Sequence, residues 1–132
     1  NLLDYVKQYI PRYITKDKTP TDNRITDEGA TLGRVLFYDK MLSADNTISC
    51  GSCHIQEHAF SDLDTVSVGI NGHRTQRHSM RLINARFGDE TKFRWDETAE
   101  TLEEQMTIPI KRSEEMGYSG ENGMPNFADL IS

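Results

Sequence analysis

The stretch Cys50-Gly51-Ser52-Cys53-His54 decides how the rest of this sequence is interpreted. Its two cysteines are the only ones in the 132 residues, and a histidine follows the second immediately. Cys-x-x-Cys-His is the spacing through which a c-type haem is attached. Residues three apart lie on one face of a helix, so both sulfurs can reach one porphyrin edge while the His54 ring points at the iron. The pattern predicts one covalent haem c, attached at Cys50 and Cys53, with His54 as the proximal iron ligand.

Three other interpretations of the cysteines compete with haem attachment. A thioredoxin-like pair would follow a strand, whereas residues 45–49 have the composition of a polar turn. Cys50 and Cys53 could bind zinc together with His73 and His78, although the gap between the two pairs is longer than in the usual zinc finger. A disulfide across two intervening residues would be strained.

Composition limits the class of protein. Fifteen basic and 21 acidic residues give a formal net charge of -6, which disfavours nucleic acid as a partner and is compatible with a cationic redox partner. No stretch is apolar enough to span a membrane. Only 36% of the residues are hydrophobic, so a buried porphyrin would supply part of the core. Because haem is normally attached to cysteines outside the cytoplasm, we expect a periplasmic (extracytoplasmic) protein.

Apolar periodicity predicts an all-α fold with long loops. Residues 1–25 form an N-terminal extension with a short amphipathic helix before Pro11, and residues 26–132 form a cytochrome c-type haem domain. The first helix of this domain begins after the cap Thr26 and runs to about Tyr38. Its apolar side chains, Leu32, Val35 and Leu36, are predicted to face a core or the haem edge.

The remaining elements are predicted from caps and breakers. Ser49 is well placed to cap the helix that carries the Cys-x-x-Cys-His motif. The segment from Phe60 to Gln76 is predicted to be a long functional loop. Further helices are predicted after a cap at Ser79, from Leu102 until Pro109 stops it, and from Phe127 to Ile131.

Several stretches together resemble one family. They are Leu32 to Asp39, Leu42 to Asp45 and Ile48 to His54, followed in the same order by Ser79 to Ala85, Phe93 to Asp96, Leu102 to Gln105, Pro109 and Glu114 to Met116. From about Thr26 the chain is similar to the N-terminal, peroxidatic haem domain of the bacterial di-haem cytochrome c peroxidase and MauG family. The resemblance implies an oxidoreductase that reduces hydrogen peroxide with electrons from a second haem, fed by a small cytochrome c or a cupredoxin.

The resemblance also implies roles for four residues. Glu115 matches the distal carboxylate that moves protons during cleavage of the O–O bond, and Gln105 matches a polar neighbour in the same pocket. Pro109 matches another residue of the distal pocket, and Trp95 matches a tryptophan between the two haems. Without the resemblance, each glutamate would be assigned to a solvated face and Trp95 to a core.

One departure from the family concerns the sixth iron ligand. Ile70 occupies the place at which members with a bis-histidine haem carry their second histidine, and an aliphatic side chain cannot bind iron. The simplest hypothesis is an open haem, five-coordinate or water-bound. His73, in the same loop, and the methionines Met80, Met106 and Met116 are the alternative ligands. A methionine ligand would make the chain a mono-haem electron-transfer cytochrome.

A second departure is length. The family has a second haem domain, which is missing from this chain, so we expect an excised or cleaved domain that is poorly active alone. The resemblance also implies a calcium ion between the two domains, with Asn84 as the contribution of this half. Calcium prefers six or more oxygens, so we do not expect tight binding to this half. The MauG branch, which oxidises a protein substrate, is the alternative to peroxide reduction.

Overall fold

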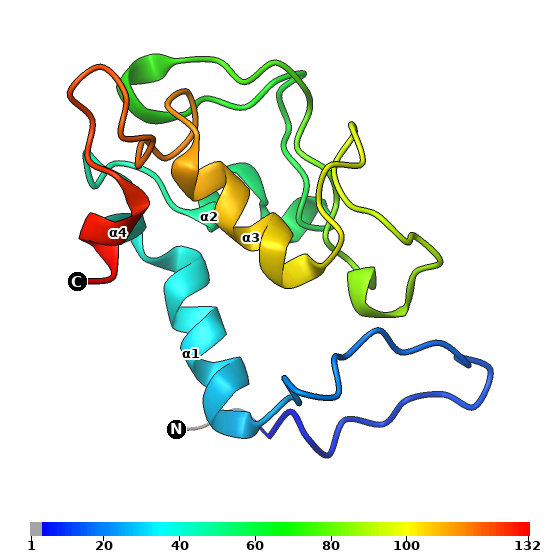
Figure 1. Ribbon diagram of the computed structural model, residues 1–132. Helices are drawn as coiled ribbons and strands as arrows, with labels where there is room; N and C mark the ends of the chain where they lie inside the picture. The colour runs from blue at the N-terminus through cyan, green and yellow to red at the C-terminus, as the bar shows by residue number, and fades with distance from the viewer. Residues whose placement is uncertain (1–3) are drawn as a thin grey trace.

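A computed structural model describes residues 4–132. Its α-helices are α1 (Asp27–Tyr38), α2 (Cys50–Cys53), α3 (Leu102–Lys111) and α4 (Phe127–Leu130), and its 3-10 helices are Lys40–Leu42, Gln56–His58, Ile70–Gly72 and Ala85–Phe87. Within residues 4–132, extended pairing is limited to isolated bridges such as that between Ile55 and Ser61. The predicted all-α fold with long loops is confirmed (Figure 1).

Helix α1 has the predicted bounds. Thr26 Oγ1 accepts a hydrogen bond of 2.9 Å from the N–H of Gly29, and carboxylates occupy the first turn, where the helix dipole favours them. For the protein atoms the prediction that its apolar residues face a core is wrong, and the alternative, that they face the haem edge, stays a prediction. Leu32 and Val35 are 58% and 60% exposed, and no described atom lies within 4 Å of a Cβ built on Gly33.

The N-terminal extension does not form the predicted helix in its described part, residues 4–10, and residues 1–3 lie outside the described range. The N–H groups of Tyr5 and Val6 instead donate to Asp27 Oδ1, at 2.7 and 2.9 Å. A helix this short is not stable without tertiary contacts, so these bonds to α1 decide the conformation. The boundary between the extension and the haem domain, at residue 26, stays a prediction.

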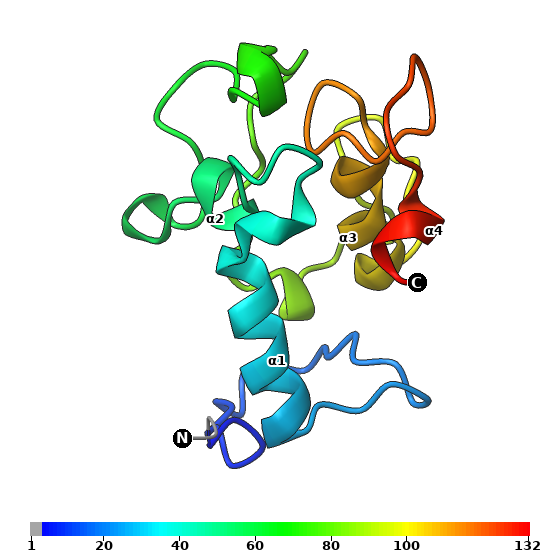
Figure 2. The same ribbon diagram turned by 90° about the vertical axis from the view of Figure 1, so that its left-hand side faces the viewer.

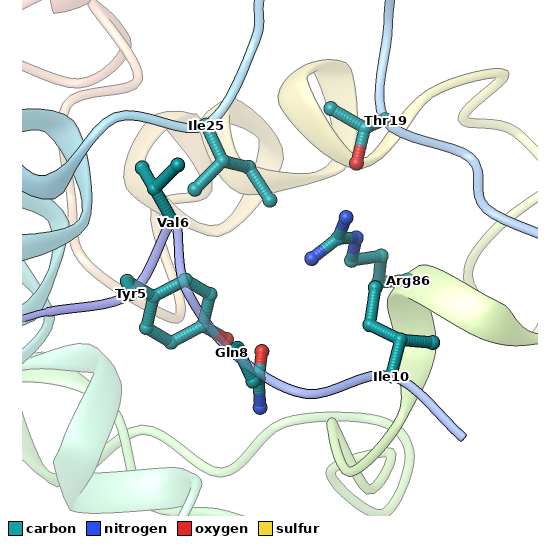
Figure 3. A pocket seen from close by; sticks show the side chains of 7 residues that line it. All are labelled: Tyr5, Val6, Gln8, Ile10, Thr19, Ile25 and Arg86. Carbon is teal, nitrogen blue, oxygen red and sulfur yellow. The ribbon is translucent and has the colours of Figure 1, made fainter.

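The extension is joined to the domain by an ion pair. Arg86 donates to Asp17 through Nη2, at 2.5 Å, and through Nε, at 2.9 Å. These hydrogen bonds hold the pKa of Asp17 far below its usual range. Beside the pair lies a hollow of about 170 Å³, bordered by Val6, Ile10 and Ile25 (Figure 3). None of the predicted site residues lines it.

Two predictions about helix ends are wrong. No α-helix follows Ser79, because its hydroxyl and carbonyl are used by the preceding loop: Ser67 Oγ lies 2.5 Å from Ser79 Oγ, and Ser61 Oγ donates to Ser79 O at 2.9 Å. Pro109 does not stop α3, which continues to Lys111. A proline removes one backbone hydrogen bond, and so close to the C-terminus the helix continues for two residues past it.

The protein core is small and lies beside α3. Its buried apolar residues are Ile70, Ala99, Ile110 and Met116, of which Ile70 is 0% exposed. Ile70 N–H donates to Glu115 O at 2.9 Å, and Ala44 N–H donates to Met116 O at 2.8 Å. A Cβ added to Gly69 would overlap the carbonyl oxygen of Glu114. The loop around Ile70 is therefore packed tightly against the turn that follows α3.

The helices lie in two groups (Figure 2). Helix α1 meets α2, where a Cβ on Gly51 would come within 2.7 Å of the Tyr38 ring. Helices α3 and α4 lie together on the other side, and Lys111 Nζ is 4.8 Å from the centre of the Phe127 ring. Among residues 4–132, no helix is both long and apolar enough to cross a membrane.

Candidate functional site

Both thiols of the motif are carried by one helical turn. The predicted cap at Ser49 is confirmed: Ser49 is the residue before α2, and its N–H donates to Ser52 Oγ at 3.0 Å. Cys50 and Cys53 are free thiols, so they form no disulfide. Burial raises the pKa of both, and a hydrogen bond from Ser67 to Cys53 acts in the opposite direction.

The imidazole of His54 is oriented by a backbone carbonyl. Its Nδ1 lies 2.9 Å from Phe60 O. A carbonyl can only accept, so Nδ1 carries the proton and Nε2 keeps its lone pair for a metal. This is the usual way in which an outer partner fixes a ligating histidine.

A strained turn aims that carbonyl. Ala59 and Phe60 have φ of 57° and 59°, a left-handed conformation that costs non-glycine residues roughly 1–2 kcal/mol each. The turn is closed by Ile55 N–H to Ser61 O, at 3.0 Å, and by Phe60 N–H to Ile55 O, at 2.9 Å. Strain held by surrounding bonds is typical of functional sites.

These features fit a covalent haem. Among residues 4–132 His54 Nε2 has no hydrogen-bond partner, both thiols are free, and the apolar face of α1 beside α2 is exposed. Zinc fits less well. Within residues 4–132 no group of three or more His, Cys, Asp or Glu side chains could hold a metal ion. His73 is exposed, and both ring nitrogens of His78 bind protein oxygens.

Glu115 is a partly buried carboxyl beside an arginine. Its side chain is 26% exposed, and Arg112 Nε lies 3.8 Å from its Oε1. Burial raises the pKa of Glu115, although the charge of Arg112 acts in the opposite direction. Its neighbour Glu114 pairs more closely with Arg112 Nη1, at 3.0 Å, and has a lowered pKa. The charge of Glu115 also raises the pKa of Cys53, so the carboxyl lies close enough to the Cys-x-x-Cys-His motif to affect it electrostatically.

Gln105 and Pro109 lie one turn apart on α3. Pro109 O accepts from the N–H groups of Arg112, at 3.3 Å, and Met116, at 3.2 Å, so it supports the turn that carries Glu115. Gln105 Oε1 is buried and has no hydrogen-bond partner among the described residues, 4–132. A buried amide oxygen normally has a partner, so this side chain is suited to a ligand. The Pro109 carbonyl thus connects α3 to the turn of Glu115, and the grouping of Gln105 with Glu115 in one pocket stays a prediction.

Trp95 lies on a separate loop and is 55% exposed. Its indole Nε1 donates to His78 O at 2.9 Å. This bond orients the ring, which is more than half exposed and is not part of a core. The role of Trp95 between two haems stays a prediction.

Ile70, which occupies the place of the second histidine ligand in bis-histidine members of the family, is packed away from solvent. Ile70 contacts Gly117, where an added Cβ would overlap its Cδ1. His73 has an exposed side chain, and its backbone closes the turn, with Gly69 N–H donating to His73 O at 2.7 Å. Of the candidate methionine ligands, Met116 is buried in the protein core, whereas Met80 and Met106 are exposed.

Asn84 occupies a left-handed turn, with φ of 58°, and is exposed. Its carbonyl accepts from Phe87 N–H at 2.9 Å. This explains an asparagine there without a metal, because asparagine tolerates the left-handed region. Its predicted contribution to a calcium site stays a prediction.

Sequence reasoning missed three contributors to the site. They are the Phe60 carbonyl on His54, the Arg112 guanidinium on Glu115 and the Ser67 hydroxyl on Cys53. Arg112 could have been found, because an arginine three residues before a glutamate lies within reach of it. The other two depend on backbone conformation and on contacts across the loop.

Comparison with known proteins gives consistent matches. The family described as Di-haem cytochrome c peroxidase matches residues 27–129. The methylamine utilization protein MauG of Methylorubrum extorquens is 36% identical over 118 residues, which cover 85% of this chain and 33% of MauG. The cytochrome c551 peroxidase of Pseudomonas aeruginosa is 36% identical over 92 residues, which cover 70% of this chain and 26% of the peroxidase.

A crystal structure of a MauG-like protein associated with microbial copper homeostasis superposes with a TM-score of 0.78 and 38% identity, covering 92% of this chain and 34% of that one. The chain thus spans about a third of the length of such relatives. The family match, the fold and the Cys-x-x-Cys-His helix agree with one another, and the chain belongs to the di-haem cytochrome c peroxidase family.

Proposed function

We propose that this chain is the peroxidatic haem domain of a di-haem peroxidase, which reduces hydrogen peroxide to water. The observation that carries the proposal is a partly buried carboxyl with a raised pKa, Glu115, in the same region as the haem-attachment motif. Such perturbed carboxyls mark sites of proton transfer. Cys50, Cys53 and His54 would hold the haem, which supplies the iron at which peroxide is reduced.

The protein residues supply proton handling. Reduction of one peroxide to two waters consumes two electrons and two protons. Glu115 can take a proton from one peroxide oxygen and return one to the other, and burial, which raises its pKa, favours the protonated form that returns it. The Gln105 amide, whose Oε1 lacks a partner in the described part of the chain, can accept a hydrogen bond from bound peroxide.

We propose that the distal side is open to peroxide. Ile70 cannot bind iron, and its complete burial beneath Gly117 supports a role in packing. The side chain of His73 is exposed, and hydrogen bonds to its backbone N–H and carbonyl hold the residue in a closed turn. A ferric absorption spectrum of the haem-loaded protein tests this. We expect a high-spin signature, and a low-spin bis-imidazole spectrum or the charge-transfer band of a methionine ligand would contradict it.

The function is tested by a matched pair of substitutions, Glu115→Gln and Glu103→Gln. Glu103 is an exposed carboxylate that accepts from Asn23 Nδ2 at 3.1 Å, so its loss removes equal charge at the surface. The ferric, haem-loaded protein is mixed with peroxide and the rate of the absorbance change is measured. We expect Glu115→Gln to slow it by about 10²–10⁴-fold and Glu103→Gln to leave it unchanged. Equal rates in all three proteins would refute the role of Glu115.

A MauG-like oxidation of a protein substrate is the second candidate. It is favoured by the match to MauG, which covers 85% of this chain, compared with 70% for the cytochrome c551 peroxidase. A longer protein with both haem domains distinguishes the two functions. Steady-state peroxide reduction with a reduced small cytochrome or cupredoxin supports the peroxidase, and peroxide consumption only with a protein substrate supports the MauG-like activity.

The proposed setting follows from the haem. Covalent attachment is completed outside the cytoplasm, so we propose a periplasmic location. The net charge of -6 favours a basic electron donor, and the second haem domain would pass its electrons past Trp95. Alone, the domain is expected to turn over slowly, because one ferrous haem supplies one of the two electrons needed.

A further inference from the structure

Lys18, in the N-terminal extension, has a charged end that is buried without a partner. Its Nζ is buried and has no hydrogen-bond partner among residues 4–132, and residues 1–3 carry no carboxylate side chain. The nitrogen lies 5.5 Å from the centre of the Phe93 ring. A ring face attracts a cation, but it cannot accept the three hydrogen bonds that an ammonium can donate. Because buried charges in proteins are normally paired, this position is suited to an anionic ligand.

Two carboxylates close to Lys18 already bind other cations. Asp17 accepts from Arg86 Nη2 at 2.5 Å, and Asp89 accepts from Lys16 Nζ. The hydrogen bond from Lys16 lowers the pKa of Asp89, whereas Lys18 acts on this carboxyl through its charge alone. Neither carboxylate therefore satisfies the Lys18 ammonium.

The extension lies at the end of α1 that is farthest from the haem-attachment motif. At the C-terminal end of α1, the ring of Tyr38 meets Gly51 of α2. At the other end, Thr19, the residue after Lys18, borders the same hollow as Ile25, which precedes α1 by one residue (Figure 3). Both ribbon views show α2 and the extension at opposite ends of α1 (Figures 1 and 2). The 12 residues of α1 separate them by about 18 Å.

Exposed apolar side chains occupy the length of α1 between these two ends. Leu32 and Val35 are 58% and 60% exposed, and they are predicted to contact the porphyrin. In a haem c the thioether bonds join one edge of the porphyrin, and two propionate carboxylates extend from the opposite edge. With one edge held beside α2 and the ring covering α1, the propionate edge lies on the side of the extension.

We propose that the Lys18 ammonium binds a propionate carboxylate of the haem, so that the extension forms one wall of the haem site. The contact is a charge-assisted hydrogen bond. A cation at the porphyrin edge favours ferrous over ferric iron, because reduction removes a positive charge from its surroundings, so Lys18 raises the reduction potential of the haem. The inference rests on the covalent haem and is independent of the reaction with peroxide.

The contact is tested by resonance Raman spectroscopy of the ferric, haem-loaded chain, in which the bending vibration of a propionate shifts to higher frequency when its carboxylate accepts a hydrogen bond. Lys18→Met keeps the apolar stem beside Phe93 and removes the ammonium. The control is Lys7→Met, which removes the same charge from a side chain that is 82% exposed. We expect one propionate band to move to lower frequency in Lys18→Met and both bands to stay in place in Lys7→Met. Unchanged bands in Lys18→Met would overturn the proposal.

The midpoint potential of the haem is the second readout of these variants. We expect the equilibrium constant for reduction to fall about three- to tenfold in Lys18→Met and to stay unchanged in Lys7→Met. A tenfold fall corresponds to a potential lower by about 59 mV for a one-electron couple. Equal potentials in the wild type and Lys18→Met would contradict a charge contact at the porphyrin edge.

A soluble anion could satisfy the same ammonium, and inorganic phosphate distinguishes the two sources. Phosphate is added at constant ionic strength to the wild type and to Lys18→Met. A propionate contact predicts that phosphate changes neither the propionate bands nor the potential of the wild type. A potential that depends on phosphate in the wild type, but not in Lys18→Met, would assign Lys18 to a soluble anion and overturn the propionate contact.

Lys18→Arg provides the test if Lys18→Met does not fold. Its guanidinium keeps the charge but donates from a planar group, so we expect the wild-type potential and a shifted propionate band. An unchanged band in this variant would also overturn the proposal. Failure of the wild type to react with peroxide would refute the proposed function and leave these readouts intact, whereas unchanged bands with normal peroxide reactivity would refute the Lys18 contact alone.

Discussion

Ile70 offers the sharpest test of how the distal side is built. It is 0% exposed, its Cδ1 fills the space over Gly117, and its N–H donates to Glu115 O at 2.9 Å. Truncation to alanine leaves the hydrogen bond in place and removes three carbons from a fully enclosed position. Such truncations cost about 2–5 kcal/mol, and Ile70→Val, which removes one carbon, costs about 0.5–1.5 kcal/mol. A loss at the upper end would be a large fraction of a total stability of about 5–15 kcal/mol.

The assay is urea unfolding of the haem-loaded protein, followed by haem absorbance and by far-ultraviolet circular dichroism. Coincident transitions justify a two-state free energy of unfolding. We expect the order wild type, Ile70→Val, Ile70→Ala. If Ile70→Ala unfolded within about 0.5 kcal/mol of the wild type, the side chain would not be the packing element described here.

The substitution Ile70→His tests whether a side chain at position 70 can bind the haem iron. The buried side chain is enclosed by the turn that follows α3, so we expect loss of stability from a buried imidazole and a ferric spectrum that stays high-spin. A stable variant with a low-spin bis-imidazole spectrum would refute this reasoning, since it would require residue 70 to reach the iron.

Three further predictions can be measured in the same urea titrations. Gly69→Ala forces a methyl group onto Glu114 O, so we expect a loss of about 1–3 kcal/mol. Burial raises the pKa of Glu115, so its neutral form stabilises the fold below the unfolded-state pKa. This contribution is lost as pH rises through the folded-state pKa. We therefore expect Glu115→Gln to be more stable than the wild type at about pH 8 and equal to it at about pH 3.5. Arg86 lowers the pKa of Asp17, so this pair stabilises the fold at neutral pH, and its contribution is lost as acid protonates Asp17. We expect Asp17→Asn to lower the free energy of unfolding by at most about 1 kcal/mol at neutral pH, and by less in high salt.

Local signals in the sequence predicted the elements that depend on local bonds. Thr26 and Ser49 were identified as caps, because short polar residues are favoured directly before the first turn of a helix, where side chains and N–H groups near in sequence bind one another. Ser79 has the same chemistry, but its hydroxyl binds Ser67, twelve residues earlier. No local pattern distinguishes these cases, so the helix predicted after Ser79 was wrong.

The residues of the candidate site also divide into those that local sequence predicts and those that it does not. Cys50, Cys53 and His54 follow from spacing alone, whereas Glu115, Gln105 and Pro109 were identified through the resemblance to the family. The structure adds a reason to group two of them, Pro109 and Glu115, since Pro109 O supports the turn of Glu115. The left-handed conformation of Ala59 and Phe60 could not be predicted, because neither residue type favours it and only the closed turn enforces it.

Phe60 has a consequence for mutagenesis. Its ring lies edge-on to Phe37 of α1, with centroids 5.9 Å apart, while its carbonyl binds His54 Nδ1. A glycine at this position would relax the backbone and abolish the aromatic contact at once. Substitutions of Phe60 therefore cannot separate the packing of this turn against α1 from the alignment of the His54 imidazole, and a changed redox potential in such a variant would have two inseparable origins.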